Sequence, residues 1–260
     1  MPDMQGAKER FDEEIQDTST YIEEGIAMGT VTILDAPKKP ITLIGSRAGI
    51  CWGADTTDDE KNYKRGMDCI ESGHGRTLEF VSVDMLLDGY SARVMREWYT
   101  HIGGAPTRLQ ASTRYIDYGE FEYVTPPSIA NDMAAKALYD ATMEVVADSM
   151  RKLEFMNHVN EVAELGFPRE DIAMLLPLGM ATRVVDKRNL RNLIDMSRQR
   201  LCNRAYWEFR ELFRDISLAL ADYSEEWARI ANMCFYPKCK ALGYCPEKRG
   251  CGLMPKKGEA

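Results

Sequence analysis

The chain is 260 residues long, 45% hydrophobic and 28% charged, and it carries a formal net charge of −8 at pH 7. This composition predicts a globular protein with a hydrophobic core of its own. The sequence has no apolar run of about 18 residues, so we expect no membrane span. The acidic balance argues against a nucleic-acid-binding protein, because phosphate backbones attract basic surfaces.

The amino terminus and the cysteine content bear on location. The first residues are polar and lack the apolar segment of a secretory signal, so we expect a cytoplasmic protein. Its seven cysteines are then expected to be free thiols or metal ligands rather than a disulfide framework. Composition divides the chain into a polar N-terminal extension (1–28), a main domain (29–232) and a cysteine-rich C-terminal tail (233–260).

Local patterns in the first half of the chain predict three strands and two helices. The β-branched segments 30–35 and 41–44 are typical of strands, and residues 58–72 are typical of a helix that ends at a glycine. Residues 78–87 alternate between apolar and polar side chains, which predicts a strand with one buried side. A helix is expected over residues 91–101, stopped by the glycines that follow.

The second half is predicted to be mainly helical. Residues 114–124 favour a strand, a turn and a strand, and Ser128 is a candidate cap for a long helix. A short helix is expected after Pro168, followed by helices over 189–200 and 204–221. The apolar stripes are Ala134, Ala137, Leu138, Ala141 and Val145 in the long helix, and Phe209, Leu212, Phe213, Ile216 and Leu220 in the last one.

The distribution of these elements predicts an α+β fold, with a mixed β-sheet and packed helices. Strands concentrate in the first half and helices in the second, which differs from a regular βαβ alternation. The sequence contains neither a Gly-x-Gly-x-x-Gly motif after a strand nor a P-loop, so these two common phosphate sites are excluded.

The first candidate site is a histidine between two glycines, Gly73-His74-Gly75, with Glu79 close behind it. A histidine at such a junction is accessible to a ligand. It is also the kind of residue that caps the preceding helix, and the segment alone leaves both interpretations open.

The second candidate site spans residues 98–115, where glycines and a proline follow His101. Ser112, Thr113 and Arg114 then offer hydroxyls, backbone N–H groups and a guanidinium within three residues. This combination suits a phosphate, which guanidinium groups bind in a fork. The alternative is a surface loop in which Arg114 pairs with a glutamate.

The third candidate site is the arginine-rich, mainly helical segment 189–209. Few acidic side chains lie near enough in sequence to neutralise it, which favours a bound anion, although such a helix also occurs as a solvated face. Cys202 lies between two arginines and is either a nucleophile of lowered pKa or a buried helix cysteine. The arginines are Arg191, Arg198, Arg200 and Arg204, and the local acids are Asp195 and Glu208.

These sites, in this order, resemble the flavin-dependent thymidylate synthase family. The resemblance covers roughly residues 45–215, and its specificity comes from several short motifs in register. The matching motifs are Gly73-His74 with Glu79, His101 leading to Ser112-Thr113-Arg114-Tyr115, Pro168-Arg169-Glu170 through Leu176-Pro177-Leu178, Asn189-Leu190-Arg191-Asn192-Leu193, and Arg200 with Tyr206-Trp207-Glu208-Phe209.

The chain also departs from the family pattern. The signature triplet Arg-His-Arg is Thr100-His101-Ile102 here, and two extra residues separate it from Ser112. An arginine expected before Leu-Pro-Leu is replaced by Ala173, and Arg204 stands where a histidine is expected. Positive charge is therefore missing around the expected ligands, and Arg108 in the lengthened loop is a candidate replacement.

The resemblance implies a thymidylate synthase-complementing type fold, with residues 29–232 as the flavin- and nucleotide-binding catalytic domain. It implies a homotetramer that contains FAD and converts dUMP to dTMP with methylenetetrahydrofolate and NADPH. The implied roles are catalysis for Arg200 and His74, FAD binding for His101, Asn189, Arg191 and Arg204, and nucleotide binding for Ser112, Thr113, Arg114 and Glu97.

Two alternatives follow from the altered triplet. One is a related flavoenzyme that acts on another pyrimidine nucleotide or only oxidises NADPH. The other is a non-catalytic homologue that binds a nucleotide. The family uses no cysteine nucleophile, which removes that role from Cys202.

The tail contains four cysteines within eighteen residues, separated by prolines and glycines: Cys234, Cys239, Cys245 and Cys251. Four thiols in such a turn-forming segment are a candidate site for zinc or an iron–sulfur cluster. The spacing lacks the tight C-x2-C pair typical of zinc sites, so a reduced extension packed on the main domain is the alternative.

Overall fold

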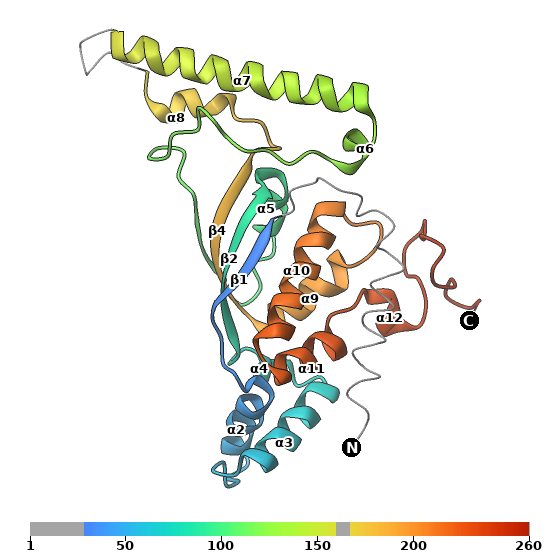
Figure 1. The fold of residues 1–260 in the computed structure, drawn as a ribbon. Coiled ribbons are helices and arrows are strands. Elements are labelled where there is room, and N and C mark those ends of the chain that lie inside the picture. Colours follow the sequence, from blue (N-terminus) through green and yellow to red (C-terminus); the bar gives the residue numbers. More distant parts are fainter. Residues whose placement is uncertain (1–28, 160–166, 260) are drawn as a thin grey trace.

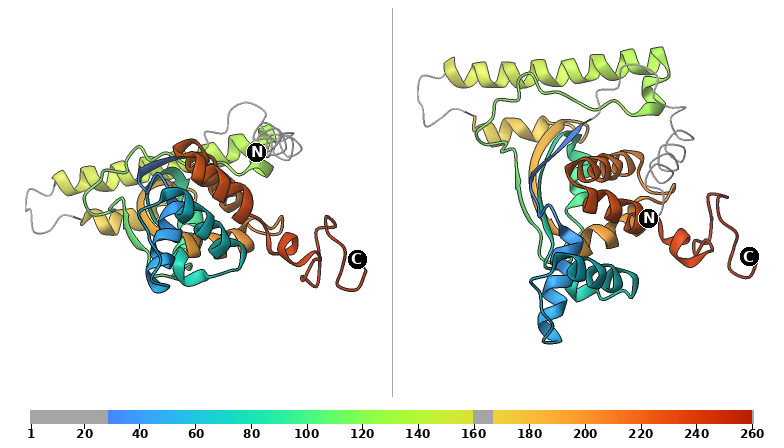
Figure 2. Two further views of the ribbon diagram at one scale, coloured as in Figure 1. Left: turned by 90° about the horizontal axis from the view of Figure 1, so that it is seen from below. Right: turned by 60° about the horizontal axis from the view of Figure 1, so that its bottom comes forward.

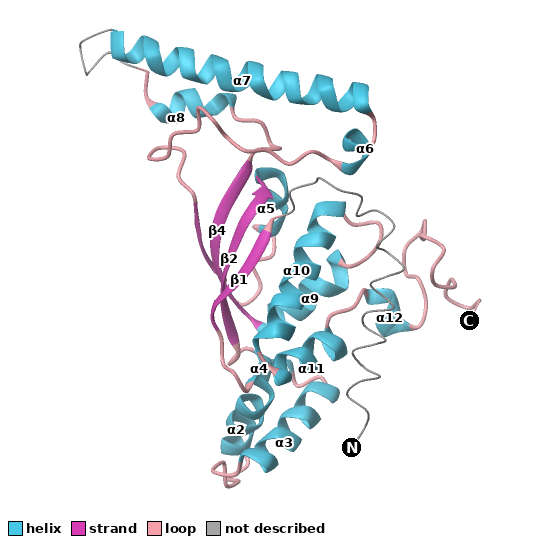
Figure 3. Ribbon diagram, viewed as in Figure 1, coloured by secondary structure: helices cyan, strands magenta, loops and turns pink. Residues whose placement is uncertain are grey.

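The fold is built around a four-stranded antiparallel sheet, as a computed structural model that describes residues 29–159 and 167–259 shows (Figures 1 and 3). The polar extension 1–28 lies outside the described residues. The strand order is β1-β2-β4-β3, which confirms the predicted α+β class. The strands are β1 (Thr30–Asp35), β2 (Ser82–Ser91), β3 (Thr107–Gln110) and β4 (Ala181–Asn189).

Helices cover one face of this sheet and both of its ends (Figures 1 and 2). The covering layer consists of α9 (Leu190–Arg200), α10 (Trp207–Tyr223) and α11 (Glu225–Cys234). The hairpin of α2 (Pro40–Cys51) and α3 (Asp59–Glu71) lies at one end, and α6 (Pro127–Ala130), α7 (Met133–Val159), α8 (Arg169–Ile172) and the 3-10 turn η2 (Ala173–Leu175) lie across the other. Short helices are α4 (Gly75–Leu78), α5 (Ala92–Trp98) and α12 (Lys238–Leu242).

The core lies between the sheet and this helical layer. The predicted stripe of α10 is fully buried, and Val83, Met85 and Leu87 of β2 face it from the sheet. Alternation in β2 and the helical period of α10 were therefore correct guides to burial. Within the described residues, no helix is both long and apolar enough to cross a membrane.

The predicted strand over residues 41–44 is wrong, because this segment is part of helix α2. Pro40 occupies the first turn, where a proline needs no hydrogen bond from its own nitrogen. Gly45 then allows α2 to cross α3 closely, since a Cβ there would lie 1.8 Å from the carbonyl oxygen of Asn62. A short apolar run is ambiguous between strand and buried helix, and here the packing against α3 decides.

The predicted strand–turn–strand over residues 114–124 is also wrong. This segment is irregular apart from one bridge between Tyr123 and Met180. The third and fourth strands of the sheet are instead β3 and β4, which sequence analysis did not identify. In β4 the buried positions alternate correctly, but two of them are Asp186 and Arg188, so the segment lacks an apolar stripe.

Helix α7 begins later than expected, and its buried side is not the predicted one. Asp132, not Ser128, caps it, accepting hydrogen bonds from the backbone N–H groups of Ala134 and Ala135 at 2.9 and 3.0 Å. The predicted apolar stripe, which includes Leu138 and Val145, is exposed in the chain. The inward side carries Met143, Ala147 and Met150.

The centre of the sheet contains a buried ion pair. The Arg188 Nη2 group donates to Asp186 Oδ1 at 2.7 Å, and both side chains have no exposed surface. Trp98 Nε1 donates to the same Asp186 oxygen at 3.0 Å, and the Arg188 guanidinium carbon lies 4.0 Å from the Trp98 ring centroid. Asn192 Oδ1 accepts a further bond from Arg188 at 2.7 Å, so both charges have polar partners.

Replacing Arg188 should therefore be costly. Arg188→Met leaves the Asp186 carboxylate buried without its counter-charge, and we expect a loss of about 3–5 kcal/mol in the free energy of unfolding. Arg183→Met is the matched control on the same strand, because it breaks only the exposed pair with Asp88 and should cost far less stability. Urea unfolding measures both losses, and equal effects would contradict the role given to the buried pair.

Candidate active site

The clearest polar cluster joins Glu97, His101 and Arg200, three residues singled out from the sequence. Arg200 Nε donates to His101 Nε2 at 2.9 Å, and Arg200 Nη1 lies 2.9 Å from Glu97 Oε2. The guanidinium carbon also lies 4.7 Å from the ring centroid of Phe209. Because all three side chains are largely shielded from water, this cluster is held more firmly than an exposed ion pair.

The charge state of His101 follows from these contacts. Burial, and then the positive charges of Arg200 and Arg188, lower the pKa of His101 from 6.5 to about 4. A neutral ring can accept the hydrogen bond from Arg200 at Nε2, whereas an imidazolium ring would repel the guanidinium. His101 is therefore a neutral acceptor, and Nδ1 carries its proton.

Buried contacts fix helix α5, the helix that leads into this cluster. Glu208 Oε1 accepts from the backbone N–H of Ser91 at 2.6 Å, and the Ser91 hydroxyl caps α5, which ends just before His101. The Trp98 ring packs on Phe209 at 5.6 Å between centroids, and Phe209 meets the His101 ring at 5.7 Å. The last turn of α5 is thus fixed to both α10 and the sheet.

The loop after His101 closes against the start of α9. Asn189 caps this helix, its Oδ1 accepting from the Asn192 backbone at 2.9 Å. Gly104 has φ +73°, and a Cβ on it would lie 2.1 Å from Asn189 Nδ2. The glycine therefore permits both the turn and the close approach of the loop to the Asn189 amide.

A second cluster brings Arg191, Glu79 and the His74 segment together. Arg191 Nη1 donates to Glu79 Oε1 at 2.6 Å, and its guanidinium carbon is 3.3 Å from a Cβ built on Gly75. His74 lies just before α4 at the surface, with Nδ1 2.6 Å from the Ser72 hydroxyl. That hydroxyl donates to a backbone carbonyl of α3, so His74 Nδ1 donates to it and Nε2 remains an acceptor.

The predicted phosphate residues Ser112, Thr113 and Arg114 lie elsewhere, against α8. The Ser112 hydroxyl accepts from the Arg114 backbone at 3.2 Å, and the Arg114 side chain pairs with Glu170 at 2.7 Å. The pairing with a glutamate was the alternative expected from the sequence. No hydrogen bond or ion pair in the described part of the chain joins these residues to the Arg200 cluster.

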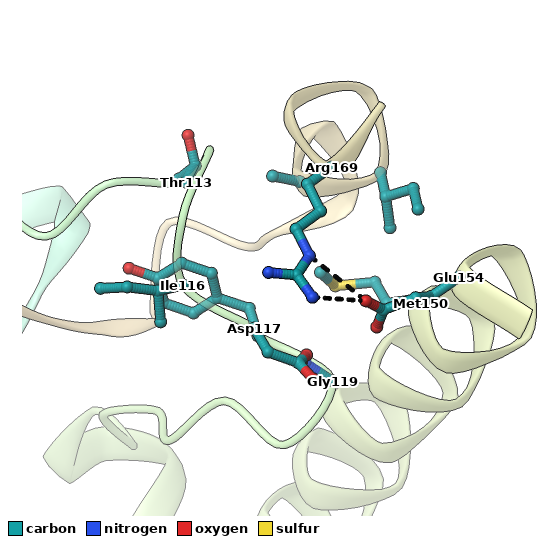
Figure 4. Close-up of a pocket in the computed structure, with 10 residues that line it drawn as sticks. Thr113, Ile116, Asp117, Gly119, Met150, Glu154 and Arg169 are labelled. Carbon is teal, nitrogen blue, oxygen red and sulfur yellow. Dashed lines mark hydrogen bonds and ion pairs between the residues drawn. The ribbon is translucent and has the colours of Figure 1, made fainter. Parts of the chain in front are cut away.

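A pocket opens beside this loop, between residues 113–119, α7 and α8 (Figure 4). Thr113 and Asp117 line one side, and Arg169 reaches in from α8, its Nη2 group 3.0 Å from Glu154 on α7. Tyr118 also lines the pocket, and its hydroxyl is buried with no hydrogen-bond partner among the described residues. A buried hydroxyl normally has a partner, so this wall of the pocket is suited to a polar ligand.

Arg204 and the tail cysteines lie apart from these clusters. Arg204 Nη1 pairs with Glu247 of the tail at 3.1 Å. Cys234 belongs to the hydrophobic core, whereas Cys239 is partly exposed and Cys251 is exposed. Across residues 29–159 and 167–259, no three His, Cys, Asp or Glu side chains stand at metal-binding separation.

Comparison with known proteins identifies the family. A family model described as thymidylate synthase complementing protein matches residues 32–222. A flavin-dependent thymidylate synthase of Nitratidesulfovibrio vulgaris is 33% identical over 190 residues, covering 72% of this chain and 74% of that protein. Similarly named enzymes of Pyrococcus furiosus (29% identical, 88% and 92% covered) and Clostridium tetani (26%, 86% and 93%) match over a longer span.

The chain belongs to the flavin-dependent thymidylate synthases. It is an enzyme of this type, and the family resemblance read from its motifs is confirmed. Arg108, the candidate replacement for a missing positive charge, stacks on the Tyr99 ring at 4.5 Å and donates to the Tyr99 carbonyl at 3.1 Å.

Several residues that organise the site were not predicted from the sequence. Asp186 and Arg188 were hidden because they occupy inward positions of a strand that lacks apolar alternation. A search for alternate positions along a strand, whatever the polarity of their side chains, would have found them. Arg169 was quoted only as part of a motif, yet it stands four residues before Ala173 on the same wall of the pocket.

The pKa of His101 predicts a pH dependence of stability. The unfolded chain takes up a proton near pH 6.5 and the folded chain near pH 4, so stability falls as the pH drops through this window. In His101→Gln, which keeps an acceptor for Arg200, this part of the loss should be absent. Urea unfolding at about pH 7.5 and about pH 5 measures it. An unchanged difference between the two pH values would contradict a neutral, buried His101.

Proposed function

We propose that this enzyme methylates dUMP to dTMP with FAD as cofactor, using methylenetetrahydrofolate as carbon donor and NADPH as reductant. The observation that carries the proposal is the fixed guanidinium of Arg200, held by neutral His101 and by Glu97. The family match supplies the reaction type.

The residues proposed for FAD fit a dinucleotide in charge and in chemistry. Helix α9 carries an arginine in its first turn and another at its end, Arg191 and Arg200, and Asn189 caps its start. The Arg191 side chain is about half exposed, so it can meet a diphosphate without giving up its place next to Gly75. We assign FAD binding to His101, Asn189, Arg191 and Arg204; the bound flavin would supply the hydride chemistry.

Among the residues proposed for the nucleotide, Thr113 lines the pocket of Figure 4, and Ser112 and Arg114 are its neighbours in the chain. Arg114 and Ser112 would meet the phosphate. Arg169 stands one helical turn from Ala173, so its guanidinium can replace the positive charge that the family arginine would supply at position 173. The unpartnered Tyr118 hydroxyl offers one more hydrogen bond to the ligand.

The protein groups around the pyrimidine would act by orientation and charge. Arg200 would hold the uracil ring, and Glu97 fixes the direction of its guanidinium. His101 remains neutral and adds no second positive charge there. His74 would lie near flavin and folate, with Nε2 available as an acceptor.

We propose a homotetramer, because the Arg200 cluster and the loop that carries Arg114 would then meet across subunits. The exposed stripe of α7 supports this, since Ala134, Ala137, Leu138, Ala141 and Val145 form an apolar surface on one helix. Among the described residues, no helix covers the second face of the sheet, where Leu109 and Val185 are exposed. Both surfaces are suited to burial against other copies of the chain.

Assay of dTMP formation from dUMP, methylenetetrahydrofolate and NADPH, with FAD added, tests the function directly. Product formation supports the proposal. A yellow, flavin-containing protein that makes no dTMP would favour the alternative of a flavoenzyme acting on another pyrimidine nucleotide. A protein that binds dUMP but no flavin would favour the non-catalytic homologue.

Arg114 and Arg200 should differ in their effect on this reaction. A hydrogen bond to a charged group is worth roughly 1.5–3 kcal/mol, so Arg114→Ala should weaken dUMP binding on the order of tenfold to a hundredfold. Arg200→Ala should lower kcat more than it weakens binding, because charge on the ring changes during the reaction. The measurements are the Kd for dUMP and kcat, with exposed Arg47→Ala as control. Unchanged values in both variants would show that the nucleotide does not bind at these residues.

The α7 stripe should control assembly. Leu138→Glu combined with Val145→Glu places two charges on the proposed interface, and we expect a smaller species by size-exclusion chromatography with light scattering. Trp52→Glu, an exposed aromatic residue beyond the end of α2, is the matched control and should leave the mass unchanged. A double variant with the mass of the unmodified protein would rule out this face as the contact.

A further inference from the structure

The carboxylate of Glu97 is an obstacle to an anionic ligand at the Arg200 cluster. A nucleotide phosphate is negatively charged, and a carboxylate beside it repels it. Glu97 and Arg200 carry opposite charges and His101 is neutral, so these three side chains together have no net charge. By themselves they give a nucleotide phosphate no electrostatic attraction.

Arg93 adds a positive charge on the other side of the same carboxylate. Its Nη2 group lies 3.7 Å from Glu97 Oε1, while Arg200 Nη1 lies 2.9 Å from Glu97 Oε2. A guanidinium thus stands at each oxygen of Glu97, and the cluster has one positive charge in excess. The next acid, Glu208, is 3% exposed, and both of its oxygens accept from Ser91, so it is directed into the interior.

The start of helix α5 determines where Arg93 lies. Arg93 is the second residue of this helix, directly after the cap formed by Ser91. Its backbone N–H donates to the carbonyl of Leu178 at 2.9 Å. Leu178 ends the segment that follows Ala173, the position at which the family arginine is missing. The first turn of α5 therefore connects the Arg200 cluster with the part of the chain that has lost a positive charge.

The Arg93 side chain is oriented and still accessible. Its guanidinium carbon lies 4.5 Å from the centroid of the Tyr206 ring, and such stacking holds a guanidinium without occupying all of its N–H donors. The contact with Glu97 is longer than a hydrogen bond, and the Arg93 side chain is 49% exposed. An oriented guanidinium that solvent can reach is suited to a phosphate.

We propose that Arg93 binds the phosphate of the nucleotide, next to the Arg200 guanidinium that would hold the uracil ring. The inference deepens the proposed function and rests on it, because it takes an anionic nucleotide as the ligand. Glu97 then acts as a positioning residue between the two arginines, with one oxygen directed to each. This role explains how a carboxylate can stand among residues that bind an anion.

Replacement of Arg93 tests the assignment in the full-length protein loaded with FAD. Arg93→Gln should weaken dUMP binding about tenfold, as expected for loss of a hydrogen bond to a charged group. Its kcat at saturating dUMP should change little, because the charge of the phosphate is the same in the ground state and the transition state. Arg93→Lys should recover part of the affinity, since it keeps the charge and loses the fork. The measurements are the Kd for dUMP by calorimetry and steady-state kinetics.

Arg47→Gln is the matched control, because it removes an exposed arginine of α2 at the far end of the sheet. It lowers the net charge of the chain equally and should leave the Kd for dUMP unchanged. Added salt should weaken dUMP binding less in Arg93→Gln than in the unmodified chain or in this control.

Two comparisons separate a phosphate contact from a structural role of Arg93. The ratio of kcat/KM for dUMP to kcat/KM for deoxyuridine, which lacks the phosphate, should fall in Arg93→Gln, and an unchanged ratio overturns the proposal. In the Glu97→Gln background, Arg93→Gln should still weaken dUMP binding. Loss of its effect there would show that Arg93 only neutralises Glu97, and would also overturn the proposal.

The outcomes for this assignment and for the proposed function are distinct. Formation of dTMP with the same Kd for dUMP in Arg93→Gln as in the unmodified chain overturns the assignment and leaves the methylation reaction. Binding of dUMP that depends on Arg93, without formation of dTMP, supports the assignment and contradicts the reaction. The urea midpoint of Arg93→Gln should stay near that of the unmodified chain, because a half-exposed ion pair contributes little to stability.

Discussion

The ion pair of Asp186 and Arg188 is the constraint on which the candidate site depends. Two charges without solvent contact are tolerated because each has further polar partners, Trp98 for the carboxylate and Asn192 for the guanidinium. Through Trp98 the pair fixes the end of α5, and through Asn192 it fixes the first turns of α9. These are the two helices that carry the Arg200 cluster.

The same arrangement sets the electrostatics at His101. Arg188 lies beneath the site and Arg200 beside it, and both disfavour a proton on the ring, in addition to burial. A protonated His101 would cost the Arg200 hydrogen bond and release the guanidinium from one of its two anchors. The positions of the two arginines keep the His101 ring neutral. The neutral ring in turn accepts the hydrogen bond that orients Arg200.

The sequence predicted much of this fold, and its errors have physical causes. The burial of β2 and α10 followed from their periods, and the Asn189 cap of α9 agrees with the predicted helix. Strand β4 was missed because an inward ion pair replaces two apolar residues. The α7 stripe was taken for a buried face, since a single chain does not reveal whether an apolar face meets its own core or another subunit.

The sequence predicted which residues form the candidate site, but not how these residues contact one another. Motifs identified Glu97, His101 and Arg200 separately, while their mutual hydrogen bonds depend on how α5 and α9 pack. The lengthened loop between His101 and Ser112 holds the clearest example. Its glycines Gly103 and Gly104 bring the backbone against Asn192 and Asn189 respectively, and its Arg108 stacks on Tyr99. Arg108 therefore already has its partner in Tyr99, whereas Arg200 at the end of α9 belongs to the cluster with His101 and Glu97.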